Sequence, residues 1–260
     1  MRILKHQSST VKEDRLFAAE YTLAIEELLE IYVNDVRYAV TMRSPGDDKH
    51  LVVGFCFSEG LVDRWNDFVA IEHYESVETA HRLMVTLRAT GKPGTRVGKP
   101  SIDLQPVARH DPICLDEIWR FKSLFDHRQE LFTLTGATHS VAMFERTRRL
   151  VAFAEDIGRH NAFDKAMGQV LCTNRMEQAY LAIVSSRLSF EMVRKAGRSG
   201  LQILCGLSAP TSMAVTMAEN LNITLIGFLR DRSLTLYTHP ERIIANHFGT
   251  GNCGLPLRKK

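Results

Sequence analysis

Residues 155–168, EDIGRHNAFDKAMG, join an apolar run to a stretch with helical periodicity, and polar side chains gather at the junction. Asp156, Arg159 and His160 are of types that bind anions, ligate metals or transfer protons. A helix that begins near Arg159 or His160 would add unpaired N–H groups and the positive end of its dipole. The junction therefore predicts a site that favours an anion.

Similar polar junctions follow later apolar runs of the chain. If these runs are parallel strands joined by crossovers of one hand, the junctions meet at one edge of a sheet. Hydroxyl and guanidinium groups gathered at such an edge suit a phosphate-bearing ligand. The residues concerned are Ser185, Ser186 and Arg187, then Ser208, Thr211 and Ser212, and finally Arg230 and Arg232.

Each of these residues also has a purely structural interpretation. Asp156 and the hydroxyl residues could only cap helices, and His160 and Asp164 are spaced so that they could pair on one helix face. His139 precedes a predicted strand and, with Asp156 and His160, could form a metal site or an acid–base set. The three residues lack a known ligand spacing, so orienting hydrogen bonds are favoured and no metal ligand is predicted.

The elements that must position these residues divide at a long loop, residues 90–112, which is rich in Gly and Pro. We predict a small, mixed, strand-rich α+β domain over residues 1–112, ending in this loop, and a larger α/β domain over residues 113–260. The smaller domain is predicted to contain a hairpin over 28–42 around Asn34-Asp35, a buried helix over 47–60, and strands over 67–74 and 81–89.

In the larger domain, apolar runs alternate with amphipathic stretches of helical length. This pattern predicts a largely parallel sheet covered by helices on both faces. The predicted helices are 115–131, 160–171, 189–200 and 210–221, and the predicted strands are 138–145, 149–155, 179–186, 201–208, 223–229 and 234–238.

Composition narrows the class of protein. The chain has 260 residues and 45% hydrophobic content, enough for a sizeable core. The N-terminus does not resemble a secretory signal and no apolar run is long enough for a membrane span, so we expect a cytoplasmic protein. A formal net charge of +3 gives no reason to expect nucleic acid. Five cysteines without a C-x-x-C pair predict neither a disulfide framework nor a structural zinc site.

Five motifs follow one another along residues 28–244: SPGDDKHLVVGFCFSEGLV, TGATHS, EDIGRHNAFDK, VSSRLSFEMVRKA and GFLRDRSLTLYTHPERI. Together they resemble the formate dehydrogenase accessory protein family, FdhD/NarQ. The resemblance implies a cytoplasmic sulfur carrier that takes sulfur from a cysteine desulfurase. The sulfur passes to the molybdenum cofactor, bis-molybdopterin guanine dinucleotide (bis-MGD), before its insertion into formate dehydrogenase. A cytidine-deaminase-like three-layer α/β fold for the larger domain and a homodimer are also implied.

The resemblance places the family's cofactor-binding stretch on a predicted loop and strand end. Here Asp231, Arg232 and Ser233 replace a Gly-Gly-Arg-like segment, and Asp231 would repel a phosphate unless it pairs with an arginine. The predicted cofactor site therefore combines this stretch with the junction residues. It comprises Phe228, Leu229, Arg230, Asp231, Arg232 and Ser233 with His139, Asp156, Arg159, His160, Ser186 and Arg187.

The family's sulfur-bearing motif, C-G-x-C-G-K-x-S-I-D, is altered in this chain. The matching residues read GTRVGKPSID, so Gly94 and Val97 stand where the two cysteines would be. Neither side chain has the thiolate sulfur that a persulfide needs. Ala137 also occupies a position that is often cysteine in relatives. Cys114 and Cys253 remain as candidate substitutes.

Three functions stay open, and whether the chain is an enzyme stays open with them. The first is sulfur delivery to bis-MGD, by a substitute cysteine. The second is a non-catalytic chaperone that holds bis-MGD and presents it to a partner. A hydrolase that uses His139, Asp156 and His160 ranks below both. Deamination is not predicted, because the P-C-x-x-C motif that completes the zinc site of deaminases is absent.

Overall fold

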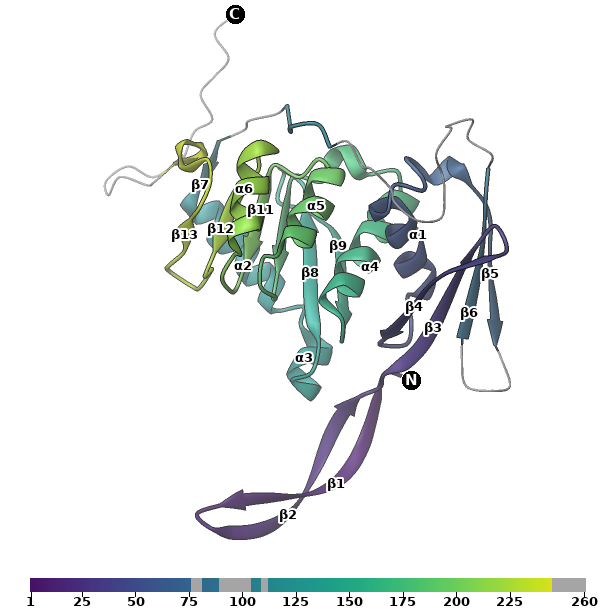
Figure 1. Cartoon of the computed structure of the whole chain (residues 1–260). Coiled ribbons are helices and arrows are strands. Elements are labelled where there is room, and N and C mark those ends of the chain that lie inside the picture. The colour runs from purple at the N-terminus through teal and green to yellow at the C-terminus, as the bar shows by residue number, and fades with distance from the viewer. Residues whose placement is uncertain (76–80, 89–103, 109–111, 245–260) are drawn as a thin grey trace, which may run out of the picture.

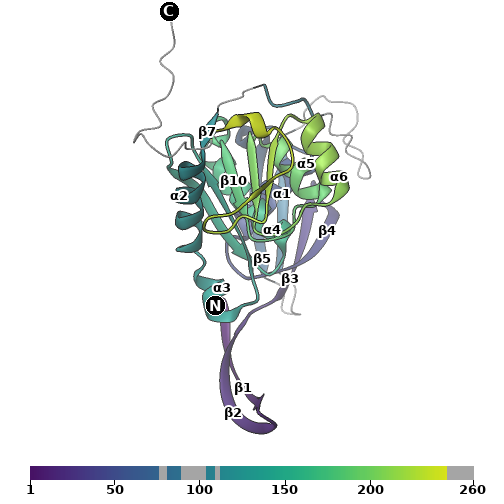
Figure 2. The same cartoon turned by 90° about the vertical axis from the view of Figure 1, so that its left-hand side faces the viewer.

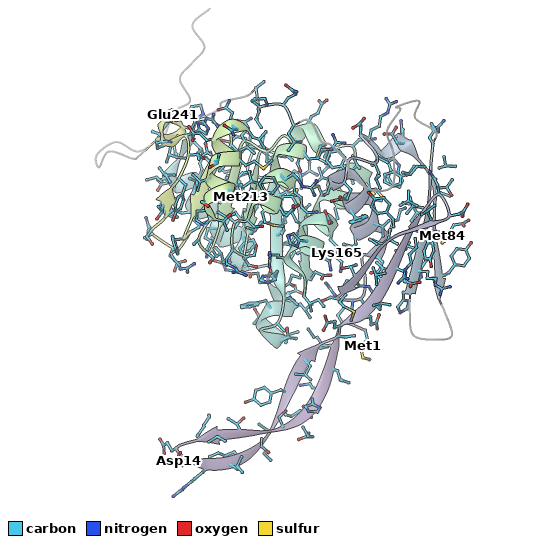
Figure 3. All side chains as sticks on the ribbon, in the orientation of Figure 1. Met1, Asp14, Met84, Lys165, Met213 and Glu241 are labelled. Carbon is cyan, nitrogen blue, oxygen red and sulfur yellow. The ribbon has the colours of Figure 1, made fainter. Side chains whose placement is uncertain are left out.

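The structure, a computed structural model, describes residues 1–75, 81–88, 104–108 and 112–244 (Figure 1). It begins with an antiparallel hairpin, β1 (Ile3–Lys12) and β2 (Arg15–Ala24), which projects away from the rest of the molecule. Asp14 lies at its far end (Figure 3). The sequence analysis missed these strands because most of their side chains are exposed, so no apolar face revealed them.

A second, four-stranded sheet has the strand order β4-β3-β6-β5. The predicted hairpin is confirmed, and its turn residues Asn34 and Asp35 both have positive φ angles, 48° and 65°. Asn and Asp tolerate this conformation, which the tightest hairpin turns require. The two further predicted strands and the buried helix are also confirmed. The elements are β3 (Glu27–Val33), β4 (Val36–Arg43), α1 (Asp48–Ser58), β5 (Phe68–Glu75) and β6 (His81–Leu87).

The largest sheet has the strand order β13-β12-β11-β10-β8-β9. The prediction of a largely parallel sheet is wrong, because only the pairings β10–β11 and β11–β12 are parallel and the other three are antiparallel. Strand β9 nevertheless runs in the direction of β10, since two antiparallel pairings separate them. The strands are β8 (His139–Phe144), β9 (Leu150–Asp156), β10 (Leu181–Val184), β11 (Ile203–Gly206), β12 (Thr224–Gly227) and β13 (Thr235–Leu236).

Helices cover both faces of this sheet (Figure 2). Side chains of α2 form one buried cluster with it, and side chains of α4, α5 and α6 join a second cluster on the opposite face. The layers match the predicted three-layer arrangement, and the likeness to cytidine deaminases stays a prediction. The helices are α2 (Leu115–Asp126), α3 (Glu130–Thr135), α4 (Arg159–Cys172), α5 (Phe190–Arg198) and α6 (Ser212–Asn220); β7 (Ile113–Cys114) and β14 (Ile243–Ile244) form a short parallel pair.

The predicted single helix over 115–131 is wrong, because the structure has two helices, α2 and α3, with a break between them. The buried carboxylate of Glu155 accepts hydrogen bonds from the backbone N–H groups of Leu131 and Phe132, at 2.8 and 2.9 Å. This acid from β9 satisfies the first turn of α3, which a continuous helix would have used internally. The sequence around the break does not reveal that its partner is Glu155, which lies more than twenty residues later in the chain.

Helices α1 and α4 pack with their backbones in contact. A Cβ atom on Gly54 of α1 would lie 1.9 Å from the carbonyl oxygen of Asp164, and one on Gly168 of α4 would lie 1.9 Å from that of His50. Only glycine permits this approach. One buried cluster extends from β3 and α1 through α4 to the six-stranded sheet. The domain boundary at residue 112 stays a prediction. Across the described ranges, no helix combines the length and apolarity needed to cross a membrane.

Candidate functional site

The carboxyl ends of β9, β10, β11 and β12 and the start of β8 lie at one edge of the six-stranded sheet. The loops at this edge lead into α4, α5 and α6, which confirms that the polar junctions meet on one side. Backbone bonds join neighbouring loops: Leu188 N–H donates to Ala209 at 3.1 Å, and Phe228 N–H donates to Ser208 at 3.2 Å. The sheet edge is therefore a connected surface.

His139 occupies the start of β8 at this edge. Its Nδ1 atom lies 3.4 Å from Ser185 Oγ, which also accepts a 3.0 Å bond from the backbone N–H of Ser140. Burial lowers the pKa of His139, and the positive charges of Arg159 and Arg187 lower it further. The ring is therefore neutral at pH 7 and can donate or accept one hydrogen bond.

Two cations lie near this histidine and have no anionic partner among the described residues. Within the described part of the chain, Arg159 and Arg187 form no ion pair, and Arg159 Nε is buried without a hydrogen bond. Ser189 is the N-cap of α5, yet its buried Oγ atom also lacks a partner. Buried donors of this kind are normally satisfied. Together with the helix N-termini of α4 and α5, they fit the phosphate groups of a ligand.

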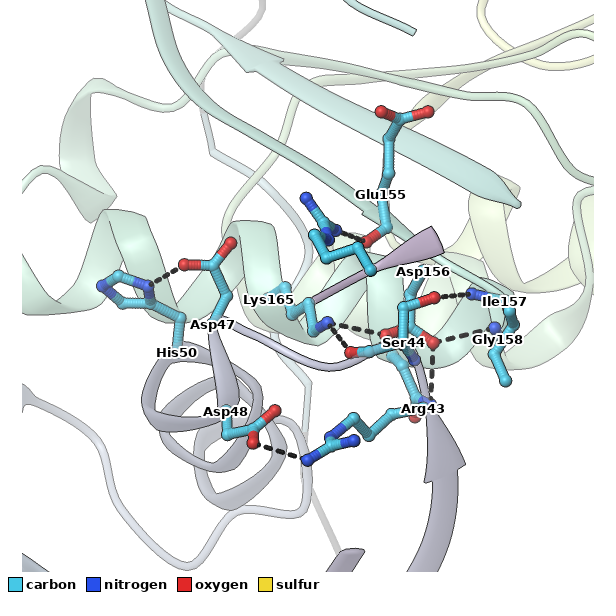
Figure 4. Close-up of polar contacts among 12 residues, drawn as sticks. Arg43, Ser44, Asp47, Asp48, His50, Glu155, Asp156, Ile157, Gly158 and Lys165 are labelled. Atoms are coloured by element: carbon cyan, nitrogen blue, oxygen red, sulfur yellow. Dashed lines mark hydrogen bonds and ion pairs between the residues drawn. The ribbon is translucent and has the colours of Figure 1, made fainter. Parts of the chain in front are cut away.

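Asp156 has a different role from the one predicted. It is fully buried, and its carboxylate lies 2.7 Å from the ammonium of Lys165 (Figure 4). One oxygen also accepts from Ser44 N–H at 3.1 Å, and the other from Gly158 N–H at 2.9 Å and Asn161 Nδ2 at 3.1 Å. This geometry does not support the prediction that Asp156 binds a ligand, because its oxygens are bonded within the protein and closed to solvent.

Ser44 completes this network and was missed by the sequence analysis, as was Lys165. The Lys165 ammonium donates to the Ser44 carbonyl at 2.8 Å, and the Ser44 hydroxyl accepts from the backbone N–H of Ile157 at 3.2 Å. The network fixes the start of α4 to the loop that precedes α1. The available signal was a lysine on a helix with apolar residues nearby on both sides, Phe163 and Ala166.

His160 belongs to another set of neighbours. Burial lowers its pKa, and the charges of Lys195 and Arg159 add to this effect. The alternative in which His160 pairs with Asp164 is not realised, because Asp164 Oδ1 contacts Lys195 Nζ at 2.5 Å and Ser58 Oγ at 2.6 Å. His160 instead lines a cavity of about 330 Å³ between β4, α1, α4 and α5.

The combination of His139, Asp156 and His160 is therefore not assembled as a hydrolytic set. Asp156 is closed off by Lys165, and apart from Arg159 the two histidines have different charged neighbours. Among the residues that the structure describes, no three His, Cys, Asp or Glu side chains are grouped to hold a metal ion. The geometry gives no support to the hydrolase hypothesis.

The stretch from Phe228 to Ser233 divides between two surfaces. Phe228 has a positive φ of 50° and an exposed ring beside Ser208, whereas Leu229 is buried. The Arg230 guanidinium donates to the carbonyl of Leu207 at 2.5 Å, which anchors the loop to the sheet edge. The backbone N–H of Arg230 donates to the carbonyl of Ser233 at 2.8 Å.

Asp231 and Arg232 face α2 instead. They line a polar cavity of about 570 Å³ together with Trp119, Arg120 and Lys122. The closest ion-pair partner of Asp231 is Lys122, at 3.9 Å. A lysine rather than an arginine therefore offsets its charge. Ser186, also predicted to bind cofactor, is buried and donates to the carbonyl of Arg187 at 3.1 Å.

The cysteines offer no accessible thiolate in the described ranges. Burial raises the pKa of the three free thiols, and two of them are completely buried. Cys114 is 4% exposed and is not a free thiol. The three free thiols are Cys56, Cys172 and Cys205, while Gly94, Val97 and Cys253 lie outside the described residues.

Comparison with known proteins agrees with the motifs and the fold. The sulfur carrier protein FdhD of Saccharolobus solfataricus is 32% identical, over 94% of this chain and 99% of its own length. The protein of that name from Mycobacterium tuberculosis is 34% identical, over 93% and 97%. A solved structure, a putative formate dehydrogenase accessory protein from Desulfotalea psychrophila, matches with a TM-score of 0.78 at 23% identity, over 94% of this chain and all of that one. The profile of the FdhD/NarQ family matches residues 24–244, and the chain belongs to this family.

Proposed function

We propose that this chain is a cytoplasmic accessory protein for formate dehydrogenase maturation, which holds bis-MGD at the edge of the six-stranded sheet. Its relatives named sulfur carrier protein FdhD support this role. The observation that carries the proposal is a pair of arginines, Arg159 and Arg187, which have no anionic partner in the described part of the chain and lie beside the N-termini of α4 and α5. Bis-MGD supplies phosphate groups that such donors bind.

Individual residues have distinct roles in this proposal. Arg159, Arg187 and the Ser189 hydroxyl bind phosphate oxygens, and neutral His139 donates or accepts one hydrogen bond at the centre of the edge. The exposed ring of Phe228 offers a stacking surface for a flat ring system of the cofactor. Arg230 holds the Phe228 loop in place rather than binding the ligand through its bonded donor.

Two versions of this function differ in how sulfur reaches the cofactor. A sulfur carrier needs a thiolate that can be loaded as a persulfide. Gly94 and Val97 carry no sulfur, and the free thiols of the described residues have raised pKa values because they are buried. These observations favour a chaperone that holds bis-MGD for a cysteine desulfurase and for formate dehydrogenase, without a persulfide of its own.

Intact mass spectrometry separates the two versions. The purified chain is incubated with an active cysteine desulfurase and cysteine, and its mass is measured before and after reduction. The chaperone version predicts no reductant-labile gain of sulfur. A gain that disappears in Cys114→Ala or Cys253→Ala would show that this cysteine is the carrier.

Complementation tests the function as a whole. Formate dehydrogenase activity is measured in cells that lack their own accessory protein and express this chain. We expect the chain to restore activity and the double variant Arg159→Glu, Arg187→Glu to fail. Full activity from a folded double variant would contradict the proposed cofactor site.

The proposal includes a homodimer, in which the β1–β2 hairpin contacts a second copy. A two-stranded hairpin is marginally stable alone, and this one exposes Leu16, Phe17 and Tyr21. Deletion of residues 1–24 is expected to halve the mass measured by light scattering. An unchanged mass would place the dimer contact elsewhere, and a monomeric full-length chain would contradict the dimer.

A further inference from the structure

The cavity beside His160 has features of a second binding site, next to the sheet edge. It occupies about 330 Å³ where the four-stranded sheet, α1, α4 and α5 meet. This volume lies at the lower end of the range for small-molecule pockets, about 300–1,000 Å³. One wall is apolar and the other carries charged and polar groups, an arrangement typical of a site for a small organic molecule.

Donors on the polar wall lack acceptors. The Lys195 side chain is 5% exposed, and its ammonium has one hydrogen bond, to Asp164, which leaves two of its three N–H groups without an acceptor in the described structure. His160 Nε2 is buried and also lacks a partner. A buried ammonium with unused donors is costly, so a carboxylate placed against Lys195 would be stabilised.

Acceptors on the same wall are equally available. Arg194 bridges Glu59 and Glu191, with one oxygen of each carboxylate bonded to it at 2.8 and 3.0 Å. Their second oxygens have no partner among the described residues. Counting Asp164 and Lys195, the wall has three acids and two bases, and neutral His160 adds no charge. A slight negative excess disfavours a phosphate dianion and favours a ligand that also carries an ammonium group.

The apolar wall of the cavity determines which kind of ligand side chain fits. Ile31 and Leu51, each 1% exposed, line it together with Val40 and Phe55. Thr41 also lines the cavity, but its hydroxyl already donates to the Asn161 side-chain carbonyl at 3.2 Å. The ligand therefore has an apolar tail opposite its charged groups.

We propose that this cavity binds a free α-amino acid with an aliphatic or thioether side chain. The α-carboxylate contacts Lys195 and His160, the α-ammonium contacts Glu191 and Glu59, and the side chain packs against Val40 and Phe55. This cavity adjoins the cofactor edge, because His160 follows Arg159 at the start of α4. Its test uses free amino acids and no nucleotide, so the result can be told apart from that for the proposed maturation function.

Isothermal titration calorimetry on the full chain, without cofactor, tests the proposal. The probes are L-leucine and L-methionine, with 4-methylpentanoate and 3-methylbutylamine as leucine analogues that lack the amino or the carboxylate group. We expect at least one of the two amino acids to bind, and both analogues to bind at least 10-fold more weakly than leucine or not at all. Inorganic phosphate is expected not to compete.

Two variants locate the site. Val40→Trp fills the cavity from a position that is 43% exposed, so folding is preserved, and it should abolish binding. Glu191→Gln removes one ammonium contact and should weaken binding at least 10-fold. Glu219→Gln, the same change on α6 outside the cavity, should have no effect. Thermal melting verifies that each variant is folded.

The proposal would be overturned by any of three results. In the first, neither amino acid binds at millimolar concentration. In the second, the analogues bind as tightly as the amino acids. In the third, both cavity variants retain wild-type affinity. The first result would mean that the cavity is closed to amino acids. The second would mean that zwitterion recognition is absent, and the third that binding occurs elsewhere.

Discussion

The ammonium of Lys165 lies 2.7 Å from the carboxylate of Asp156, and both side chains are fully buried. Burial lowers the pKa of Lys165, while the Asp156 charge opposes this effect. Asp156 accepts three further hydrogen bonds from the chain, and Lys165 donates one to the Ser44 carbonyl. The pair connects the end of β9 to α4 directly below the candidate cofactor edge, so that edge depends on it for its shape.

Removing one partner of this buried ion pair should lower the free energy of unfolding much more than removing one partner of an exposed pair. Lys165→Met leaves the Asp156 carboxylate buried without its counter-charge, and we expect a loss of about 3–5 kcal/mol in the free energy of unfolding. Urea denaturation measures this loss. Lys5→Met breaks the exposed pair with Glu20 and should cost at most about 1 kcal/mol. Equal effects of the two substitutions would contradict the structural role of Lys165.

Stability should fall as the pH decreases below about 6.5, the ordinary pKa of histidine. The pKa values of His139 and His160 are lowered in the folded protein, chiefly by burial. Above pH 7 both histidines are neutral in the folded protein and in the unfolded chain. At lower pH the unfolded chain binds protons first, so stability is lost until the folded pKa values are reached.

Thermal melting between pH 8 and pH 5 measures this dependence. His139→Gln and His160→Gln should each reduce the loss of stability on acidification, whereas His6→Gln, on the exposed hairpin, should leave it unchanged. An unchanged pH profile in the His139→Gln, His160→Gln double variant would show that other groups cause the dependence.

Nucleotide affinity should depend on the two arginines of the sheet edge. Guanosine diphosphate, the nucleotide portion of bis-MGD, serves as the probe. Arg159→Ala and Arg187→Ala each remove a charged hydrogen-bond donor, worth about 1.5–3 kcal/mol, so each should weaken binding at least 10-fold. Arg175→Ala removes a cation before β10, at the opposite edge, and should change little. Equal affinities of all three variants would place the nucleotide elsewhere.

At the glycine positions where α1 and α4 touch, any side chain should destabilise the protein. Gly54→Ala would put a Cβ atom 1.9 Å from a backbone oxygen, which a side-chain rearrangement cannot relieve. We expect a loss of about 3 kcal/mol or more, measured by urea denaturation. Gly136→Ala is the control: its φ is +66° but no atom lies within 4 Å, so strain of about 1–2 kcal/mol is expected. A milder effect at Gly54 would show that the helices can separate.

Local sequence patterns were sufficient where a segment packs on one face. The hairpin over 28–42 and the helix over 47–60 were predicted from alternation and turn residues, because their apolar side chains enter a core. Strands β1 and β2 were not predicted in this way, because most of their side chains are exposed and enter no core. The antiparallel direction of β8 and β9 was missed although the sequence contained it. Only residues 145–149 separate these strands, and a parallel pair needs a crossover of about a dozen residues or more.

The candidate site was predictable as a location and less so in detail. The strand-to-helix junctions in the sequence predicted that the site lies at the sheet edge, with Arg159, Arg187 and His139. Asp156 could not be separated from them by sequence, because its partners Lys165 and Ser44 come from a later helix turn and from a loop more than one hundred positions earlier. Charge and hydrogen-bond capacity indicate that a residue needs a partner, and only the fold shows which partner it has.

The close contact of α1 with α4 also sets an order for events during synthesis. Gly54 leaves the ribosome more than one hundred residues before Gly168, which corresponds to a delay on the order of ten seconds. During that interval α1 and the four-stranded sheet have no partner for the face that later meets α4. The N-terminal third of the nascent chain is therefore the part most in need of a chaperone that covers apolar surface until translation has passed α4.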